Sequence, residues 1–473
     1  MISPASRLLR FATALSLLTG TGCSTLGSVK DTFFGGSAAE QPALEGFIGA
    51  AVADEPRAAL AGREVLSRGG TAADAAVAMG FMLAVTLPSR AGLGGGGACM
   101  AYSPDRNGPG GGNAEAILFT PVASTNPPPQ TDRLASIPMM PRGLFALHAR
   151  YGRLPFESLV APAEQAARFG IPIPRALLQD LSVVAGPLLQ DPNARAVFGP
   201  SGTPLAEGST LSQPDLAATL SQLRTAGVGD LYVGALARRM AEASVAAGGG
   251  LVAEQMRDAL PRTGNPITVT SGRDLVGFLP PPADGGLAAA AGLQALNAGG
   301  DAGQAQARAL AVAARWRAGG GDPMAVLASG GSGGGLPNLP ASTGWLVLDR
   351  DGNSVACAAT MDNLFGTGRV APGTGVLLAA APRPMPLLSV AMAWNPSLRG
   401  FRAAVTGTGQ EGAALAAAAG MYNALHSDTA MPRSVPEPGR ANVISCARYL
   451  PDSSGTCTWA VDPRSSGLAA GGN

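Results

Sequence analysis

The segment TAADAAVAMGFMLAVTLP, Thr71 to Pro88, constrains the fold of this chain more than any other stretch. Thr71 is placed to cap a helix, with Asp74 at the third helical position, and Pro88 marks the end of the helix. Because the segment is apolar on almost every side, a helix of this sequence must be buried within the fold. The chain of 473 residues is long enough for one large domain, or two ordinary ones, that would cover it.

The pattern around this segment divides the chain into a helix-rich part and a β-rich part. EPRAALAGREVLSRGG predicts a helix that ends at Gly69-Gly70, and residues 142–173 predict two helices broken near Gly152. From Ser342 onward, TGWLVLDRDGNSVACAATM reads as strand, Asp-Gly turn and strand. FRAAVTGTG then predicts a strand ending in a glycine loop, and QEGAALAAAAGMYNAL a buried helix. This order of elements favours sheets covered by helices.

The N-terminus predicts an export signal. Arg7 and Arg10 precede an apolar run, Phe11 to Leu18, that is too short to span a bilayer. Small residues then lead to Cys23, as in a bacterial lipoprotein signal, so we expect a signal peptide over 1–22 and a lipid on Cys23. The alternative is an unmodified thiol near an ordinary cleavage site. A polar linker, 23–45, follows, and we expect a periplasmic or outer-membrane-anchored protein that meets the membrane only through this lipid.

Composition excludes several classes of function. The net charge is +1 and only 14% of the residues are charged, so nothing indicates nucleic-acid binding. With only two histidines, His148 and His426, a Ser-His-Asp triad and a multi-histidine metal site are excluded, and we expect neither metal nor cofactor. Any general base must therefore come from another group. The glycine run Gly92 to Gly97 lacks the context of a dinucleotide-binding or P-loop motif.

The cysteines beyond Cys23 fall into two pairs. Cys446 and Cys457 bracket a turn-rich loop suited to a disulfide in an oxidising compartment. Cys99 and Cys357 lie in apolar surroundings, where we expect buried free thiols.

The order of landmarks resembles the gamma-glutamyltransferase family, whose members are also called glutathione hydrolases. Its counterparts here are GREVLSRGGTAADAAVA, GLGGGG, RYGRLPFESLVAPA, DLYVG, LPPPADGG, GGGDP and FGTGRVAPGTGVLL. The resemblance implies an α+β N-terminal-nucleophile hydrolase fold, a four-layer αββα sandwich in a single large domain. It also implies a precursor that cleaves itself into two subunits, here 46–341 and 342–473.

The same resemblance identifies the nucleophile. Counting back from Asp349 places Ser342 where the family has its threonine nucleophile, with Thr343 second and Gly344 in place of a histidine. A serine hydroxyl can attack the preceding carbonyl, that of Ala341, and water can open the resulting ester. The amine that is freed has a reference pKa of about 7.7–8.0, so it can serve as general base without histidine.

Further site residues are implied by the family pattern. Thr360 matches a second hydroxyl that contacts the nucleophile, and Asp362 replaces an amide donor with what we expect to be an acceptor-only carboxylate. The loop 406–412 replaces a glycine-rich oxyanion loop, and Thr120 stands where the family has the arginine for the substrate's α-carboxylate. The residues expected to bind substrate are thus Thr343, Asp362, Ser389, Thr408, Gly409, Gln410 and Thr120.

These residues predict an amidohydrolase with an altered substrate. Losing an arginine–carboxylate contact removes roughly 1.5–3 kcal/mol of binding. The groups that would hold the α-amine are also replaced, by Ala379, Ala380, Ala381 and Pro384. We therefore expect self-cleavage at Ala341–Ser342 and transfer or hydrolysis of a γ-glutamyl or related acyl group from a small amide or peptide. The alternative is a pseudoenzyme of the same fold that acts as an envelope lipoprotein.

Overall fold

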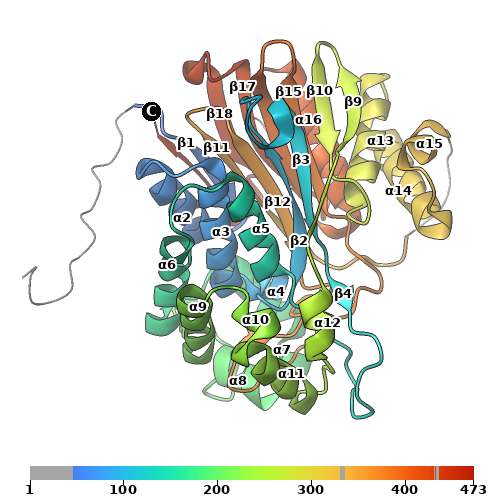
Figure 1. Cartoon of the computed structure of the whole chain (residues 1–473). Helices are drawn as coiled ribbons and strands as arrows, with labels where there is room; N and C mark the ends of the chain where they lie inside the picture. The colour runs from blue at the N-terminus through green and yellow to red at the C-terminus, as the bar shows by residue number, and fades with distance from the viewer. Residues whose placement is uncertain (1–45, 331–335, 431, 433–435, 473) are drawn as a thin grey trace, which may run out of the picture. The chain divides into compact units, whose positions relative to one another are not determined.

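Two antiparallel sheets face each other at the centre of the protein (Figure 1). The computed structural model describes residues 46–330, 336–430, 432 and 436–472, so the predicted signal peptide, Cys23 and the linker lie outside the described residues. The first sheet has the order β19 (Leu468–Gly472), β1 (Gly49–Ala53), β11 (Ser342–Asp349), β12 (Ser354–Thr360), β2 (Gly96–Tyr102), β3 (Ala114–Phe119) and β8 (Arg262–Gly264). The second has the order β18 (Cys457–Val461), β17 (Arg440–Leu450), β16 (Gly400–Thr408), β15 (Ser389–Asn395), β10 (Asp274–Phe278) and β9 (Ile267–Ser271).

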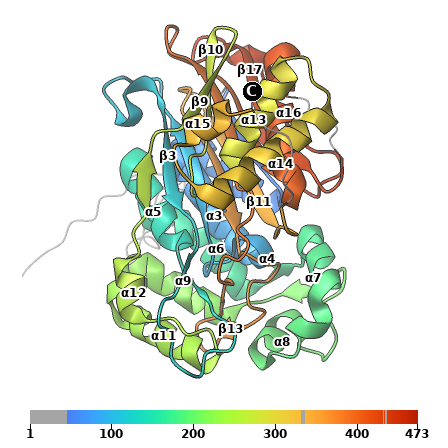
Figure 2. The same ribbon diagram turned by 90° about the vertical axis from the view of Figure 1, so that its right-hand side faces the viewer.

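Helices cover the outer face of each sheet, which completes the predicted αββα sandwich (Figures 1 and 2). α2 (Pro56–Ser67), α3 (Ala72–Thr86), α5 (Met140–Tyr151) and α6 (Phe156–Phe169) lie on the side of the first sheet. α13 (Gly285–Asn297) and α16 (Ala413–His426) pack on the second sheet, with α14 (Ala302–Gly319) and α15 (Pro323–Ala328) beside them. Within the described residues, no helix combines the length and apolar character needed to cross a bilayer.

Further helices and small hairpins lie at the end of the sandwich that holds β4 and α4 (Figure 1). The helices are α4 (Pro88–Ala91), α7 (Arg175–Leu188), α8 (Pro192–Phe198), α9 (Pro214–Ala226), α10 (Asp230–Val233), α11 (Ala235–Ala246) and α12 (Ala253–Asp258). The small hairpins are β4 (Val122–Ala123) with β5 (Ser136–Ile137), β6 (Ile171–Pro172) with β7 (Thr210–Leu211), and β13 (Val370–Ala371) with β14 (Val376–Leu377). The landmark FGTGRVAPGTGVLL thus forms only the two-residue pairing of β13 with β14.

α3 confirms the prediction of a fully buried helix. Every residue of α3 is buried, and Thr71 and Asp74 form the reciprocal capping box that satisfies the first backbone N–H groups. The Asp349 carboxylate accepts a hydrogen bond from the Ala72 N–H at 3.0 Å, so the β11–β12 turn is tied to the start of α3. Burial raises the pKa of Asp349 to about 6.

The β11–β12 hairpin sets the direction of each side chain in the predicted site. Trp345 of β11 faces the helices, and its indole N–H donates to the Ala76 carbonyl at 3.0 Å. Leu346 packs between the two sheets, because successive side chains point to opposite faces. Ser342 and Thr360 pair in the hairpin register and lie on the same inner face as Leu346. A hydroxyl pair therefore lies at one end of the space between the sheets.

The segment that precedes Ser342 enters the core before it reaches β11. Residues 331–335 lie outside the described residues, whereas Leu339 is buried in the core beneath α13 and α16. Pro340 is also buried, and Ala341 is partly exposed. The residues just before Ser342 therefore pack against the helix layer of the second sheet.

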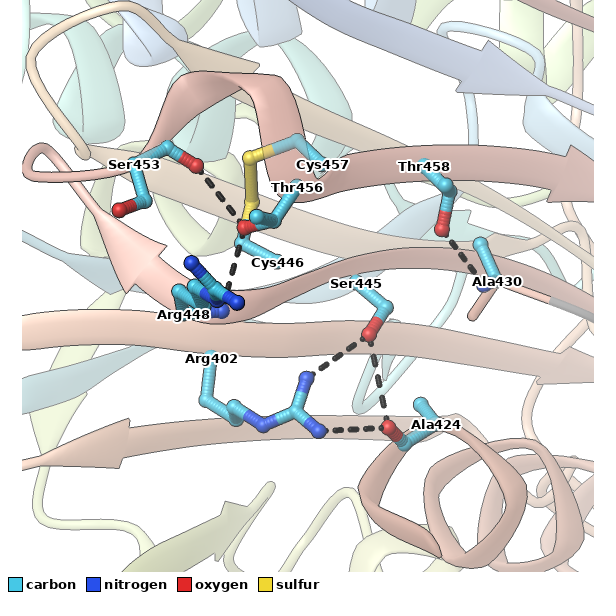
Figure 3. Close-up of a disulfide and its surroundings, with 10 residues drawn as sticks. All are labelled: Arg402, Ala424, Ala430, Ser445, Cys446, Arg448, Ser453, Thr456, Cys457 and Thr458. Carbon is cyan, nitrogen blue, oxygen red and sulfur yellow. Dashed lines mark hydrogen bonds between the residues drawn. A yellow bond between two sulfur atoms is a disulfide. The ribbon is translucent and has the colours of Figure 1, made fainter. Parts of the chain in front are cut away.

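Two disulfides join neighbouring strands. Cys446 and Cys457 are bonded between β17 and β18, at the turn that the sequence predicts, beside the hydrogen bonds of Arg402 and Ser445 (Figure 3). Cys99 and Cys357 are bonded between β2 and β12. The expectation of two free thiols was wrong because these residues, 258 positions apart, lie directly opposite each other in the strand register.

Candidate active site

Thr360 and Ser342 bracket the peptide bond that the sequence predicts to be cleaved. The Thr360 hydroxyl donates a hydrogen bond to the Ala341 carbonyl oxygen at 3.0 Å. The same hydroxyl oxygen accepts a hydrogen bond from the Asp362 N–H at 2.9 Å, which makes it a stronger donor. A polarised carbonyl thus lies next to the Ser342 hydroxyl, which makes no hydrogen bond to any described residue and is 2% exposed.

Asp54 holds the strand directly after Ser342. One of its carboxylate oxygens accepts from the Thr343 hydroxyl at 2.8 Å and from the Gly344 N–H at 3.0 Å. The other accepts from the Asn442 side-chain amide at 2.9 Å. Asp54 follows β1 and Asn442 belongs to β17, so this carboxylate links both sheets at the root of β11.

Gly344 occupies the position where the family has histidine, and the packing explains the change. A Cβ atom added at Gly344 would lie 2.6 Å from the Thr406 hydroxyl oxygen of β16. That distance is too short for a side chain, so no histidine fits here without movement of the second sheet. The space between the sheets is closed at this level by Thr406.

A cavity of about 410 Å³ opens at Ala341, and most of the residues that line it are of polar or charged types. Arg90 of α4 forms two hydrogen bonds with the Asp180 carboxylate of α7, at 2.5 and 2.8 Å, and reaches the Ser342 carbonyl oxygen at 3.5 Å. Thr408, Gly409 and Gln410, which the sequence analysis predicts to bind substrate, also line the cavity. The remaining lining residues are Asp54, Leu87, Ala176, Gln179, Val183, Leu364, Glu437, Pro438, Arg440, Arg464, Ser465 and Ser466.

The loop after β16 turns sharply at Gly409. Gly409 has φ +102°, and a Cβ atom added there would lie 2.0 Å from the Pro438 carbonyl oxygen. Only glycine meets both conditions. Gln410 follows with φ +51° and begins a short 3₁₀ turn, Gln410–Gly412. The backbone of this loop is therefore held tightly beside the cavity.

Asp362 is a buried carboxyl group in a strained backbone position. Its φ is +59°, its side chain is 2% exposed, and Oδ1 has no hydrogen-bond partner among the described residues. The Ser136 hydroxyl donates to Oδ2 at 3.4 Å. Burial raises the pKa of Asp362 to about 8, so the group holds a proton at neutral pH. This corrects the expectation of an acceptor-only carboxylate, because a protonated carboxyl can donate a hydrogen bond as an amide does.

Three residues expected to bind substrate lie away from the Ala341 cavity. Thr343 points to the opposite face of β11 and is fully buried against Asp54. Ser389 is fully buried in β15 and donates to the carbonyls of Gly285 and Leu387. Thr120 lines a separate cavity of about 350 Å³ with mostly apolar neighbours. Strand alternation and sheet packing, which short motifs do not reveal, decide these placements.

Asp54, Arg90 and Asn442 are site residues that the sequence reasoning missed. Each contacts one or two of the first three residues of β11, and each lies more than 95 positions from its partner along the chain. The available signals were local: Asp54 directly precedes EPRAALAGREVLSRGG, the stretch predicted to form a helix, and Arg90 lies two residues before the glycine run. The two histidines have structural contacts instead, each ring nitrogen lying 2.7 Å from a backbone carbonyl oxygen.

The layered fold and the hydroxyl pair at the root of β11 are those of an N-terminal-nucleophile hydrolase. Solved structures share this fold: the cephalosporin acylase from Bacillus halodurans superposes with a TM-score of 0.72 at 18% identity, over 93% of this chain and 99% of that one. The gamma-glutamyltranspeptidase of Helicobacter pylori superposes with a TM-score of 0.53 at 23% identity, over 63% of this chain and 95% of that one.

The chain belongs to the gamma-glutamyltranspeptidase family, whose sequence model matches residues 58–324. The glutathione hydrolase proenzyme of Escherichia coli (strain K12) is 31% identical over 374 residues, which cover 67% of this chain and 63% of that protein. Glutathione hydrolase 3 of Arabidopsis thaliana is 27% identical over 385 residues, which cover 70% of this chain and 59% of that protein. The chain thus spans less than two thirds of the length of these relatives.

Proposed function

We propose that this protein is an amidohydrolase or acyltransferase that activates itself by cleaving its Ala341–Ser342 bond. The observation that carries the proposal is the 3.0 Å hydrogen bond from the Thr360 hydroxyl to the Ala341 carbonyl, beside the Ser342 hydroxyl. Membership of the gamma-glutamyltranspeptidase family supports it. So does the Escherichia coli relative, which is named a proenzyme.

The cleavage would begin with attack of the Ser342 hydroxyl oxygen on the Ala341 carbonyl carbon. The new carbon–oxygen bond forms, the bond from this carbon to the Ser342 nitrogen breaks, and the hydroxyl proton passes to that nitrogen. Thr360 would stabilise the negative charge that develops on the carbonyl oxygen, an effect of about 3 kcal/mol for one well-placed donor. Water then hydrolyses the ester, leaving a carboxylate on Ala341 and a free amine on Ser342.

The free amine of Ser342 would then serve as general base for the second reaction. Its reference pKa of about 7.7–8.0 leaves enough unprotonated amine near neutral pH to accept the hydroxyl proton during attack on a substrate amide. The amine would pass this proton to the departing amine of the substrate. Water would then attack the ester carbonyl carbon while the amine accepts one of its protons. The bond from this carbon to the Ser342 oxygen breaks, that oxygen takes the proton from the amine, and the acyl group leaves as a carboxylic acid. Asp362, protonated at neutral pH, would donate a hydrogen bond to the substrate.

The substrate of this reaction would differ from a free γ-glutamyl compound. Thr120, which replaces the family's arginine, lines a cavity whose other walls include Met139, Leu260 and Met385. Thr120 itself offers no guanidinium to the α-carboxylate of glutamate, and the arginine that lines the same cavity, Arg262, comes from β8 and not from the position of the family's arginine. We therefore propose an acyl group that is related to γ-glutamyl but lacks its full set of charges.

We also propose that the protein is exported, with Cys23 as a lipid anchor. The two disulfides support export, because disulfides persist in oxidising compartments such as the periplasm. Mass spectrometry of the mature N-terminus tests this directly: a lipid-modified Cys23 is the expected result, and an intact residue 1 in membrane-associated protein from the native host would contradict it.

The self-cleavage test uses denaturing gels of the purified protein and two variants. The gels must be reducing, because the Cys99–Cys357 disulfide joins residues on either side of the 341–342 bond. We expect two fragments for the natural protein and for Ser342→Thr, which keeps a hydroxyl, and one intact band for Ser342→Ala. Without reductant, the cleaved protein should still run as one band.

Natural protein that stays as intact as Ser342→Ala, under reducing conditions and after prolonged incubation, would contradict self-cleavage. The activity is tested separately with γ-glutamyl-p-nitroanilide and related acyl anilides. Turnover of one of them by the natural protein, absent from Ser342→Ala, is expected. Cleaved protein that turns over none of them would favour a pseudoenzyme.

A further inference from the structure

A second polar cavity lies on the other side of the loop that follows β12. It has a volume of about 480 Å³ and is formed by three loop segments, residues 133–134, 363–367 and 380–383. Leu364 lines the Ala341 cavity, whereas its neighbour Asn363 lines this second one. We call it the two-arginine pocket, because Arg133 and Arg383 both line it.

Among the described residues, no carboxylate pairs directly with either arginine of the two-arginine pocket, although the pKa of the neighbouring Asp132 is lowered by its hydrogen bond to Arg369 and, to a lesser degree, by the charge of Arg133. No carboxylate lines the pocket. Among the described residues, neither Arg133 nor Arg383 forms an ion pair, and Arg133 donates only to the Thr367 carbonyl, at 2.8 Å. The adjacent carboxylate of Asp132 already accepts two hydrogen bonds from Arg369, both at 2.6 Å. The pocket therefore holds two positive charges with unused N–H groups.

The remaining walls fit a short aliphatic chain that ends in a carboxylate. The Asn363 side chain is exposed in the pocket and can donate through its amide, while Leu134, Ala380 and Ala381 offer apolar surface. Planar guanidinium groups bind carboxylates through paired N–H donors, and such contacts are among the strongest that polar groups make. An anion with an apolar stem would bind the arginines through its charge and pack its stem against the apolar side chains.

The pocket adjoins the proposed catalytic centre through direct contacts. Asn363 follows Asp362, whose N–H contacts the Thr360 hydroxyl. On the opposite wall, the Ala380 carbonyl accepts a hydrogen bond from Ser136 at 2.5 Å, and Ser136 also contacts Asp362. A substrate whose scissile carbonyl lies at Thr360 could therefore extend past Asp362 toward the arginines.

We propose that the two-arginine pocket binds a carboxylate of the amide substrate, so that the acyl group is a dicarboxylic one held by its free end. This inference rests on the proposed amidohydrolase function and specifies its substrate class. Arg383 is the better residue to change, because its side chain is exposed and forms no hydrogen bond or ion pair with the described residues.

The kinetic test compares two substrates of equal length. Glutaryl-p-nitroanilide ends in a carboxylate, and valeryl-p-nitroanilide ends in a methyl group. We expect the natural protein to prefer the glutaryl compound, and Arg383→Met to raise its KM at least about tenfold with little change in kcat. The KM for the valeryl compound should not change. Arg350→Met, which changes an exposed arginine at the far end of β11, is the matched control and should affect neither substrate.

A direct binding measurement separates failure of the pocket from failure of the proposed function. Calorimetry with glutarate on the Ser342→Ala protein should show binding that is lost in Ser342→Ala/Arg383→Met. If anilides are turned over but Arg383→Met affects both equally, the pocket assignment is overturned and the enzyme remains. If no anilide is turned over but glutarate binding depends on Arg383, the result supports the pocket assignment and contradicts the proposed amidohydrolase function. Absence of both would overturn both.

Discussion

The two charged cavities beside the β12 loop use arginine in opposite ways. At Ala341, Arg90 faces Asp180, and Arg440 and Arg464 both face Glu437. In the two-arginine pocket, Arg133 and Arg383 face no carboxylate. An arginine already bound to a carboxylate fixes the elements that carry the pair, whereas an arginine without one retains its donors for a ligand. The first cavity thus holds the cleavage site in place, and the second is suited to bind.

Of the substitutions in the two cavities, removal of Arg90 should change the free energy of unfolding most. Asp180 is buried and would keep a charge with only the Ser89 hydroxyl as partner, so Arg90→Met should lower the free energy of unfolding by roughly 2–4 kcal/mol. Cleavage at Ala341–Ser342 should also slow. Urea denaturation and timed reducing gels measure these two effects.

Two further variants control for that result. Arg90→Met/Asp180→Asn should recover part of the lost stability, because the buried charge is removed together with its partner. Arg350→Met should behave like the natural protein. If Arg90→Met is as stable as Arg350→Met, the pair at Ala341 is not structural and the contrast between the two cavities fails.

Asp362 lies on the loop between the cavities and should make stability depend on pH. Its pKa is about 8 in the folded protein and 3.8 in the unfolded chain, so the folded state holds the extra proton between these values. The contribution of the Asp362 carboxyl group to the free energy of unfolding therefore falls as the pH rises from about 4 to about 8. Asp362→Asn should lack this fall, gaining roughly 1–2 kcal/mol over the natural protein between pH 6 and pH 8.

Denaturant unfolding at a series of pH values measures the effect, on the Ser342→Ala background so that the protein stays as one chain. The two proteins compared are Ser342→Ala and Ser342→Ala/Asp362→Asn. Parallel pH profiles for these two would mean that the carboxyl group is ionised in the folded protein. In that case Asp362 would be an acceptor, as its residue type alone suggests.

Arg383→Met should have the smallest effect on folding. The side chain is exposed and forms no ion pair in the described structure, so the free energy of unfolding should change by less than about 0.5 kcal/mol. Thermal unfolding compared with Arg350→Met checks this. A large loss of stability would show that Arg383 holds the loop, and its effect on KM would then not report binding.

Local patterns were sufficient to predict several elements. The capping box at Thr71 and Asp74, the buried α3 and the β11–β12 hairpin depend on residues close together in sequence, and all three are present. The pairing of Ser342 with Thr360 follows from that hairpin. The family resemblance added the four-layer fold, which no local pattern contains.

Other placements depended on how distant elements pack. Thr343 and Ser389 were expected at the substrate, but strand alternation turns one toward Asp54 and packing buries the other in β15. Cys99 and Cys357 become partners only through the register of β2 with β12. A composition rich in glycine likewise could not show that Leu339 lies in the core.

The sequence by itself determined that a hydroxyl residue stands at the start of a β-strand, with a second hydroxyl opposite it across a short hairpin. Only the tertiary structure decided which charges surround that pair: Asp54 and Arg90 beneath it, and two arginines without carboxylates beyond Asp362. The reason is physical. Hairpin register depends on a few neighbouring residues, whereas electrostatic surroundings depend on side chains brought together from hundreds of residues apart.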